Sequence, residues 1–252
     1  MPRRIFAHRG LSSVAPENTL VAIGACAENN VKWFETDIDI LGDGTPVVIH
    51  DTLLDRTTNR TGSIYDLSAK DLEGIDAGSW FGREYRGQKL PTLAQLVELM
   101  NKKELNGNIE LKPNGQGAEK AIQLIDAVIA ELENLDDDRE VIISSFDYLA
   151  LAEFKRRAPQ YCVAALMGPE MLASNWRTTL EFIDADAVHP DAAALTPELV
   201  DEMHAASFEI NAWTVNSRGR ANELFNWGVD GIITDYAHEF VDLAKANKST
   251  ES

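Results

Sequence analysis

The chain has 252 residues, of which 44% are hydrophobic and 8% aromatic, so it can bury a full core and a mainly disordered state is excluded. Its length suits one large α/β domain or two small ones, and a single α/β barrel has about 250 residues. With 41 acidic against 23 basic residues the net charge is -18, which repels nucleic-acid phosphates and anionic membranes at long range. We therefore expect no nucleic-acid partner and no stable membrane association, and an anionic substrate would need local cations or a bound metal ion.

The two cysteines, Cys26 and Cys162, lie in apolar segments and form neither a disulfide framework nor a zinc-ligand spacing. The first eight residues lack the apolar run of a signal peptide, and no stretch approaches the roughly 18 apolar residues of a membrane span. These features predict a reducing, cytoplasmic setting. The sequence gives no indication of the oligomeric state.

Short β-rich runs alternate with segments whose apolar residues recur at helical spacing, a pattern typical of a parallel sheet covered by helices. We predict eight such units, with strands at residues 5–8, 33–40, 108–111, 141–144, 162–166, 187–189, 209–215 and 231–234. Helix boundaries are indicated by capping residues, namely Asn18, Thr92 with Gln95, Thr196, Ser217 and Gly228. Eight units in this length predict an α/β fold of the closed (β/α)₈ type, a TIM barrel, with an open doubly wound sheet as the alternative.

The segment after the second predicted strand breaks this alternation. Asp43 and Gly44 are a strong hairpin signal, so the strand is expected to fold straight back through a two-residue turn. Residues 51–90 then predict at most one short helix, starting at Ser68 with Asp71 as its capping partner. We interpret 51–90 as a small subdomain inserted over one mouth of a single barrel domain, residues 1–245, which is followed by a flexible tail, 246–252.

Acidic side chains gather on one face of the second strand. Strand alternation places Glu35, Asp37 and Asp39 together, and such a row of carboxylates needs a positive partner if it is buried. Glu110 and Lys112 likewise share a face of the third strand. At neighbouring strand ends the carboxylates of Glu35, Asp37 and Glu110 would form an all-oxygen site suited to one hard divalent cation, Mg²⁺ or Ca²⁺. Solvation, or salt bridges to Lys112, is the alternative explanation.

Two histidines are candidates for acid–base catalysis. His8 ends the first strand and precedes Arg9, at the rim where barrel enzymes work. A two-residue turn would place His50 opposite Asp37 on the same face, whereas a three-residue turn would place it opposite Thr36. Two histidines with a metal ion and cationic side chains are what phosphodiester cleavage requires.

Other polar and aromatic residues are weaker candidates. Asp51 follows His50 directly and is expected to orient an imidazole or Arg9. Trp213 could line a pocket or simply fill the barrel, and Phe81 in the inserted segment could belong to a lid or to a satellite core. The remaining histidines are expected to be structural: His189, His204 and His238.

Short motifs occur in a specific order along the chain, although each is weak alone. They are AHRG at 7–10, PENT at 16–19, ETD at 35–37, VVIHD at 47–51, RTT at 56–58, DAGSWF at 76–81, LPTL at 90–93, IELK at 109–112, SF at 145–146, AWTVN at 212–216 and DGIITD at 230–235. With them the sequence resembles the glycerophosphodiester phosphodiesterase family, in its bacterial soluble cytosolic type. The resemblance covers nearly the whole chain, from residue 7 to about residue 236.

The resemblance implies a (β/α)₈ barrel with an insertion after the second strand, which matches residues 51–90 here. It implies that His8 and His50 are the acid–base pair and that Glu35, Asp37 and Glu110 are the ligands of one divalent cation. It also implies that Arg9 and Lys112 contact the phosphate and that Trp213 and Phe81 lie beside the glycerol group. Glu17 and Asn18 match a motif that shapes the loop after the first strand. Asp39 is an additional acid without an assigned part.

The implied reaction converts a glycerophosphodiester, such as glycerophosphocholine or glycerophosphoethanolamine, to sn-glycerol 3-phosphate and an alcohol. A histidine pair in opposite protonation states predicts a bell-shaped pH dependence, but the sequence does not decide which histidine is the acid. Three alternatives are a lysophospholipase D-like action, for which no apolar surface segment marks membrane docking, a barrel aldolase using Lys112, and a non-enzymatic sensor of a metal or phosphorylated ligand.

Overall fold

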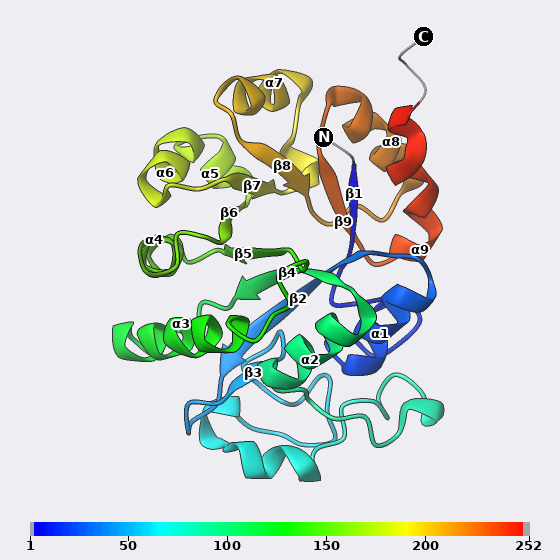
Figure 1. Cartoon of the computed structure of the whole chain (residues 1–252), viewed down its shortest axis with the longest axis vertical. Helices are drawn as coiled ribbons and strands as arrows, with labels where there is room; N and C mark the ends of the chain where they lie inside the picture. The colour runs from blue at the N-terminus through cyan, green and yellow to red at the C-terminus, as the bar shows by residue number, and fades with distance from the viewer. Residues whose placement is uncertain (1–2, 249–252) are drawn as a thin grey trace.

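A computed structural model of the chain describes residues 3–248 (Figure 1). Within this range eight parallel strands follow one another around a ring, and pairing of β1 with β2 closes the ring into a barrel. The barrel strands are β1 (Arg4–Ala7), β2 (Trp33–Ile40), β4 (Asn106–Leu111), β5 (Val141–Ser145), β6 (Cys162–Met167), β7 (Ala187–Pro190), β8 (Glu209–Ala212) and β9 (Gly231–Thr234). The predicted (β/α)₈ barrel is confirmed, and the open doubly wound sheet is excluded.

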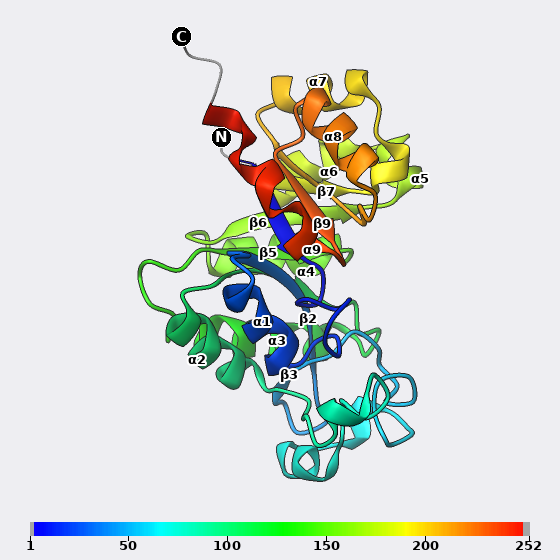
Figure 2. The same cartoon turned by 90° about the vertical axis from the view of Figure 1, so that its right-hand side faces the viewer.

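Helices cover the outside of this barrel (Figures 1 and 2). They are α1 (Leu20–Glu28), α2 (Leu93–Lys103), α3 (Ala118–Leu132), α4 (Tyr148–Arg157), α5 (Pro169–Leu172), α6 (Trp176–Ile183), α7 (Pro197–Ala205), α8 (Arg218–Trp227) and α9 (Ala237–Phe240), with short 3₁₀ helices η4 (Ala192–Ala194) and η5 (Val241–Lys248). The capping box before α2 forms as predicted, because Thr92 and Gln95 each accept a hydrogen bond from the other's backbone N–H. Gly228 ends α8 in the left-handed conformation.

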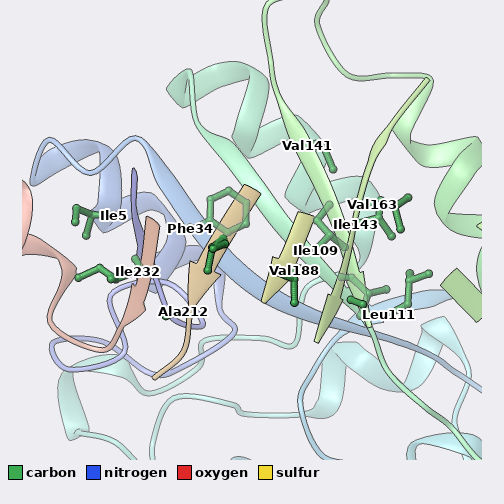
Figure 3. Packing of buried hydrophobic residues seen from close by; sticks show 14 of the residues in the cluster. Ile5, Phe34, Ile109, Leu111, Val141, Ile143, Val163, Val188, Ala212 and Ile232 are labelled. Carbon is green, nitrogen blue, oxygen red and sulfur yellow. The ribbon is translucent and has the colours of Figure 1, made fainter. Parts of the chain in front are cut away.

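Alternate strand residues face the helices and form the main apolar core. Figure 3 shows residues of this layer, among them Phe34, Ile109, Ile143, Val188 and Ile232. Successive side chains of a strand point to opposite faces. Because the apolar residues of this layer pack against the helices outside the ring, the residues that alternate with them point into the barrel. Glu35 and Glu110, which alternate with Phe34 and Ile109, are therefore directed inward.

The interior of the barrel is filled by a smaller apolar cluster and a layer of polar side chains. Phe6, Trp33 and Ile142 belong to the apolar cluster. His189 is completely buried, and the Asn211 amide donates to its Nε2 at 3.2 Å. Burial lowers the pKa of His189 to about 3, so the ring is neutral and structural, as expected from the sequence.

Buried His189 should make the protein less stable as the pH falls. Between its usual pKa near 6.5 and about 3, the unfolded chain binds a proton that the folded chain does not, so folding loses about 3 kcal/mol from pH 7 to pH 4. The His189→Gln variant lacks this titrating group, so its free energy of unfolding, measured with urea, should depend less on pH than that of the parent. Equal pH slopes for parent and variant would contradict the assignment.

The turn between β2 and β3 (Pro46–Val48) differs from the prediction. Leu41 N–H donates to the Thr45 carbonyl at 2.9 Å and Gly44 N–H donates to the Leu41 carbonyl at 3.1 Å, so the loop comprises three residues, 42–44. Gly44 has φ 95°, a left-handed conformation that ends three-residue hairpin loops and that glycine adopts without steric cost. The predicted two-residue turn is wrong.

This turn shifts the register by one residue. Asp39 pairs with Val47, and Ile49 N–H donates to the Asp37 carbonyl at 3.0 Å, so Ile49 rather than His50 lies opposite Asp37. The expectation that cross-strand pairing delivers His50 to the site is therefore also wrong. β3 ends at Val48 and the chain bends at His50. The direction of the His50 side chain is therefore not set by the alternation of side chains along the paired strands.

Residues 51–90 form a lobe beside the β2–β3 hairpin (cyan in Figure 2). They contain three short 3₁₀ helices, η1 (Ile64–Asp66), η2 (Ala69–Gly74) and η3 (Arg83–Tyr85), where at most one helix was expected. The predicted capping box of Ser68 and Asp71 is present before η2. Leu54, Ile64 and Ile75 form a separate apolar cluster with residues of the hairpin, so the segment has a small core of its own.

The domain boundaries stay a prediction. Of the expected tail, 246–252, residues 246–248 belong to η5, and 249–252 lie outside the described residues. Tyr65 of the inserted segment donates its hydroxyl to Asp39 Oδ2 at 2.8 Å. This contact gives the additional acid Asp39 a structural part, because it fastens the inserted segment to β2.

Candidate active site

One pocket opens at the carboxyl ends of the barrel strands, where barrel enzymes place their catalytic groups. His8 and Arg9 follow β1, Lys112 follows β4, and Trp213 follows β8. The pocket is lined by His8, Arg9, Glu35, His50, Asn108, Glu110, Lys112, Phe146, Leu166, Trp213, Thr214 and Ile233. Seven of the nine residues that the sequence singles out as site residues thus meet in one hollow.

Three carboxylates meet beside this pocket. Asp37 pairs with Glu110 in the β2–β4 register, and Glu35 lies two residues before Asp37 on the same face. All three side chains are buried, and one oxygen of each lies within 4.8 Å of the others. Such an all-oxygen donor set fits a hard divalent cation better than zinc, which prefers nitrogen and sulfur.

The crowding of these carboxylates shifts their pKa values. Burial, and then the charge of Asp37, raise the pKa of Glu35 to about 7 and that of Glu110 to about 8. Burial acts on Asp37 in the same direction, but the nearby cations Lys112 and Arg9 outweigh it and hold the pKa of Asp37 below its usual range. A divalent cation would relieve the repulsion among the three carboxylates.

Two cationic side chains border the carboxylates. Lys112 Nζ lies 2.8 Å from Glu110 Oε1 and 3.2 Å from Asp37 Oδ1. Arg9 has φ 58°, and its backbone N–H donates to Glu35 Oε2 at 2.9 Å while its Nε lies 3.6 Å from Asp37. Gly10 follows in a left-handed conformation where a Cβ would approach the α1 backbone to 2.7 Å, so glycine is required for the turn.

Each candidate catalytic histidine is held at Nδ1 by a carboxylate. His8 Nδ1 lies 2.7 Å from Asp235, and His50 Nδ1 lies 2.6 Å from Asp51. This contact leaves Nε2 of each ring available to a substrate. Asp51 therefore orients His50, as the sequence suggested.

The two imidazoles lie in different electrostatic surroundings. Burial acts to lower the pKa of His8, but Asp235 and Glu35 outweigh it and raise that pKa. Burial lowers the pKa of His50, and the attraction of Asp37 does not overcome it. Opposed shifts of this kind are typical of an acid–base pair.

Sequence models of protein families identify the chain. The model of the Glycerophosphoryl diester phosphodiesterase family matches residues 8–239. The chain belongs to this family. Among its relatives are glycerophosphodiester phosphodiesterases of Caldanaerobacter subterraneus, 32% identical over 97% of this chain and 99% of the relative, and of Bacillus subtilis, 31% identical over 97% and 88%.

A solved structure also matches the chain. It is an Oleispira antarctica phosphodiesterase in complex with the product sn-glycerol-3-phosphate, 32% identical, with a TM-score of 0.90 over 96% of both chains. Membership in the glycerophosphodiester phosphodiesterase family makes the chain an enzyme, so the sensor and aldolase alternatives are set aside. The charge of Lys112 agrees, because Asp37 and Glu110 outweigh its burial and raise its pKa, whereas imine formation needs a neutral amine.

Two predicted site residues are not among those lining the pocket. Asp37 is 1% exposed, less than Glu35 at 4% and Glu110 at 7%. Phe81 contacts Trp80 and Tyr85 edge to face in the inserted segment, with ring centroids 5.6 and 5.4 Å apart. A contact of Phe81 with substrate therefore stays a prediction.

Sequence reasoning assigned no part to several residues of the site. Asp235 ends the motif at 230–235, which was recognised without a role for its carboxylate. Phe146 lines the pocket and contacts Trp213 edge to face at 5.5 Å. Asn18, interpreted as shaping a loop, also donates its amide to Asp37 Oδ2 at 2.8 Å. Strand alternation could have found Asn108, which is fully buried on the inward face of β4.

Proposed function

We propose that this phosphodiesterase hydrolyses glycerophosphodiesters such as glycerophosphocholine and glycerophosphoethanolamine to sn-glycerol 3-phosphate and a free alcohol, using one Mg²⁺ or Ca²⁺ ion. The observation that carries the proposal is the meeting of two carboxylate-held histidines with three buried carboxylates at one pocket. The sn-glycerol-3-phosphate complex of the Oleispira relative supports the choice of product.

Glu35, Asp37 and Glu110 would hold the cation. When bound, it would polarise a phosphoryl oxygen and neutralise charge that grows in the transition state. Arg9 and Lys112 line the same pocket and would bind the remaining phosphate oxygens, with Arg9 suited to a two-pronged contact. Trp213 would pack against the glycerol group, with its indole fixed by a 2.6 Å hydrogen bond from Nε1 to the His189 carbonyl.

His8 and His50 would move the protons. One Nε2 takes the proton of the attacking hydroxyl, either the 2-hydroxyl of the glycerol or water, and the other Nε2 protonates the departing alkoxide. If the 2-hydroxyl attacks first, the resulting cyclic phosphate is opened by water with the two roles exchanged. Asp235 and Asp51 keep both rings in the required orientation and tautomer.

The test is enzymatic detection of glycerol 3-phosphate released from a panel of glycerophosphodiesters, with and without chelator. We expect product that disappears with chelator and returns with Mg²⁺ or Ca²⁺. Absence of metal-dependent product across all headgroups would overturn the proposed function.

A lysophospholipase D-like action is a second candidate, favoured by an apolar groove between the starts of α3 and α4. Ile122, Ile125 and Leu149 line this groove together with Asn114 and Asp147. Asn114 follows two residues after Lys112, and Asp147 follows Phe146, so both chain segments run from the groove to the active site. The sequence showed no apolar docking segment because the groove draws on two separate helices.

Leu149 is the residue with which to test this second candidate. It is 84% exposed, and Phe182 at the far end of α6 is 85% exposed and serves as the control. If an acyl chain binds in the groove, Leu149→Gln should lower kcat/KM for choline release from 1-lauroyl-lysophosphatidylcholine about tenfold. Phe182→Gln, and the activity of both variants on glycerophosphocholine, should be unchanged. Equal effects of the two substitutions would contradict lysophospholipid binding here.

No helix within the described residues is long and apolar enough to cross a membrane. The cytoplasmic location and the lack of a nucleic-acid partner stay predictions.

A further inference from the structure

Arg56 of the inserted segment joins two parts of the active site. Its Nη1 and Nη2 donate to the two carboxylate oxygens of Glu17 at 2.8 Å each, and its Nε donates to Asp51 Oδ2 at 2.5 Å. Glu17 also accepts from Arg9 Nη1 at 2.8 Å, and Asp51 holds His50 at 2.6 Å. A continuous series of charged contacts thus runs from Arg9 through Arg56 to His50.

Arg56 itself lies outside the pocket. It does not line the hollow that holds the histidines, and 45% of its side chain is exposed. The carboxylates that it joins are more buried, with exposed side-chain fractions of 13% for Glu17 and 27% for Asp51. Arg56 can therefore influence the reaction only through its partners.

Other contacts attach the inserted segment to the barrel. Tyr65 donates to Asp39 at 2.8 Å, and the Tyr85 hydroxyl donates to the Val14 carbonyl at 2.6 Å. The segment also has its own apolar cluster. Because these attachments do not involve Arg56, its removal should leave the fold intact.

We propose that Arg56 is a positioning residue, which fixes Asp51 against His50 and shares the charge of Glu17, so that Glu17 competes less with the substrate phosphate for Arg9. This inference rests on the proposed phosphodiesterase activity. The planar guanidinium of Arg56 suits this role, because three of its N–H groups donate to two carboxylates at once, a geometry that lysine does not reproduce.

Loss of Arg56 should affect two steps of the reaction. Asp51 would keep only its contact with His50, so the imidazole would gain rotational freedom and kcat should fall by about 10- to 100-fold, as for other residues that orient a catalytic ligand. Glu17 would be left with Arg9 as its single cationic partner, and the stronger pairing would compete with the phosphate. We therefore expect KM to rise as well.

The test compares Arg56→Ala with Arg83→Ala in the full-length protein, using glycerophosphocholine and glycerol 3-phosphate detection. Arg83 lies on the same inserted segment, in η3, and is exposed, so its removal changes the net charge equally. Arg83→Ala should match the parent. Millimolar guanidinium, but not tetramethylammonium at equal ionic strength, should restore activity to Arg56→Ala, because the half-exposed site can admit the free cation.

Two further variants separate positioning from a general structural effect. Arg56→Lys should recover part of kcat. In an Asp51→Asn background Arg56→Ala should cost little further kcat, because both changes act on His50 through the same contact, while the rise in KM that passes through Glu17 should remain. The inference is overturned if Arg56→Ala keeps the kcat and KM of the parent, or if it loses activity that neither guanidinium nor lysine restores. A parent protein without product would instead refute the proposed function itself.

Discussion

Asp37→Asn is expected to abolish stoichiometric binding of the divalent cation and to lower kcat/KM for glycerophosphocholine by about 10³-fold or more. Asp37 is buried beside Glu35 and Glu110, and the cations Lys112 and Arg9 hold its pKa below the usual range, whereas the pKa values of the two glutamates are raised. Among the three carboxylates, Asp37 is therefore the one that most favours the charged form that binds a cation. A bound metal ion stabilises transition-state charge by several kcal/mol, and about 4 kcal/mol corresponds to 10³ in rate.

Asp39→Asn is the matched control for this prediction. Asp39 is equally buried on the same strand face, but its carboxylate accepts from Tyr65 and lies outside the three-carboxylate cluster. Calorimetric titration with Mg²⁺ and Ca²⁺, together with the product assay, should show intact metal binding in this variant. Retention of metal and activity by Asp37→Asn would contradict the assigned ligand set.

Single removal of either candidate catalytic histidine should lower kcat by about 10² to 10⁴ while leaving metal binding intact. The double variant His8→Ala/His50→Ala should be only slightly worse than the more damaged single one, because residues that act as a unit are not additive. His204→Ala is the control, since that ring pairs with Asp230 on the surface, at 3.0 Å, away from the pocket.

A substrate with a better leaving group would assign the two roles. With glycerophospho-p-nitrophenol the departing phenolate needs no proton, so the variant lacking the general acid should recover most of its activity, and the other variant should not. The raised pKa of His8 and the lowered pKa of His50 lead us to expect recovery in His8→Ala. Equal recovery in both variants would contradict a division of labour between the histidines.

The barrel and the cluster of three carboxylates could be predicted because they depend on local periodicity. Alternation along β2 and β4 fixes the faces of Glu35, Asp37 and Glu110 before any tertiary contact forms. Capping residues such as Thr92 likewise act on backbone groups a few residues away. These features require only the local backbone geometry and the burial of one face.

His50 shows where local reasoning fails. Its position was inferred from a two-residue turn, but the left-handed conformation of Gly44 gives a three-residue loop and a register that is shifted by one residue. His50 nonetheless lines the pocket, because the chain leaves the ladder after Val48. The position of His50 at the pocket was thus inferred through a wrong register, and its catalytic role stays a prediction.

The sequence alone determined the fold class, the family and the chemical types of the site residues, because periodicity, motif order and spacing are properties of the chain itself. Only the tertiary structure decided which distant groups contact them: Asp235 meets His8 across 227 positions, and Arg56 meets Glu17 across 39. Such contacts depend on barrel closure and on how the inserted segment lies against it, and a linear pattern carries no information about either.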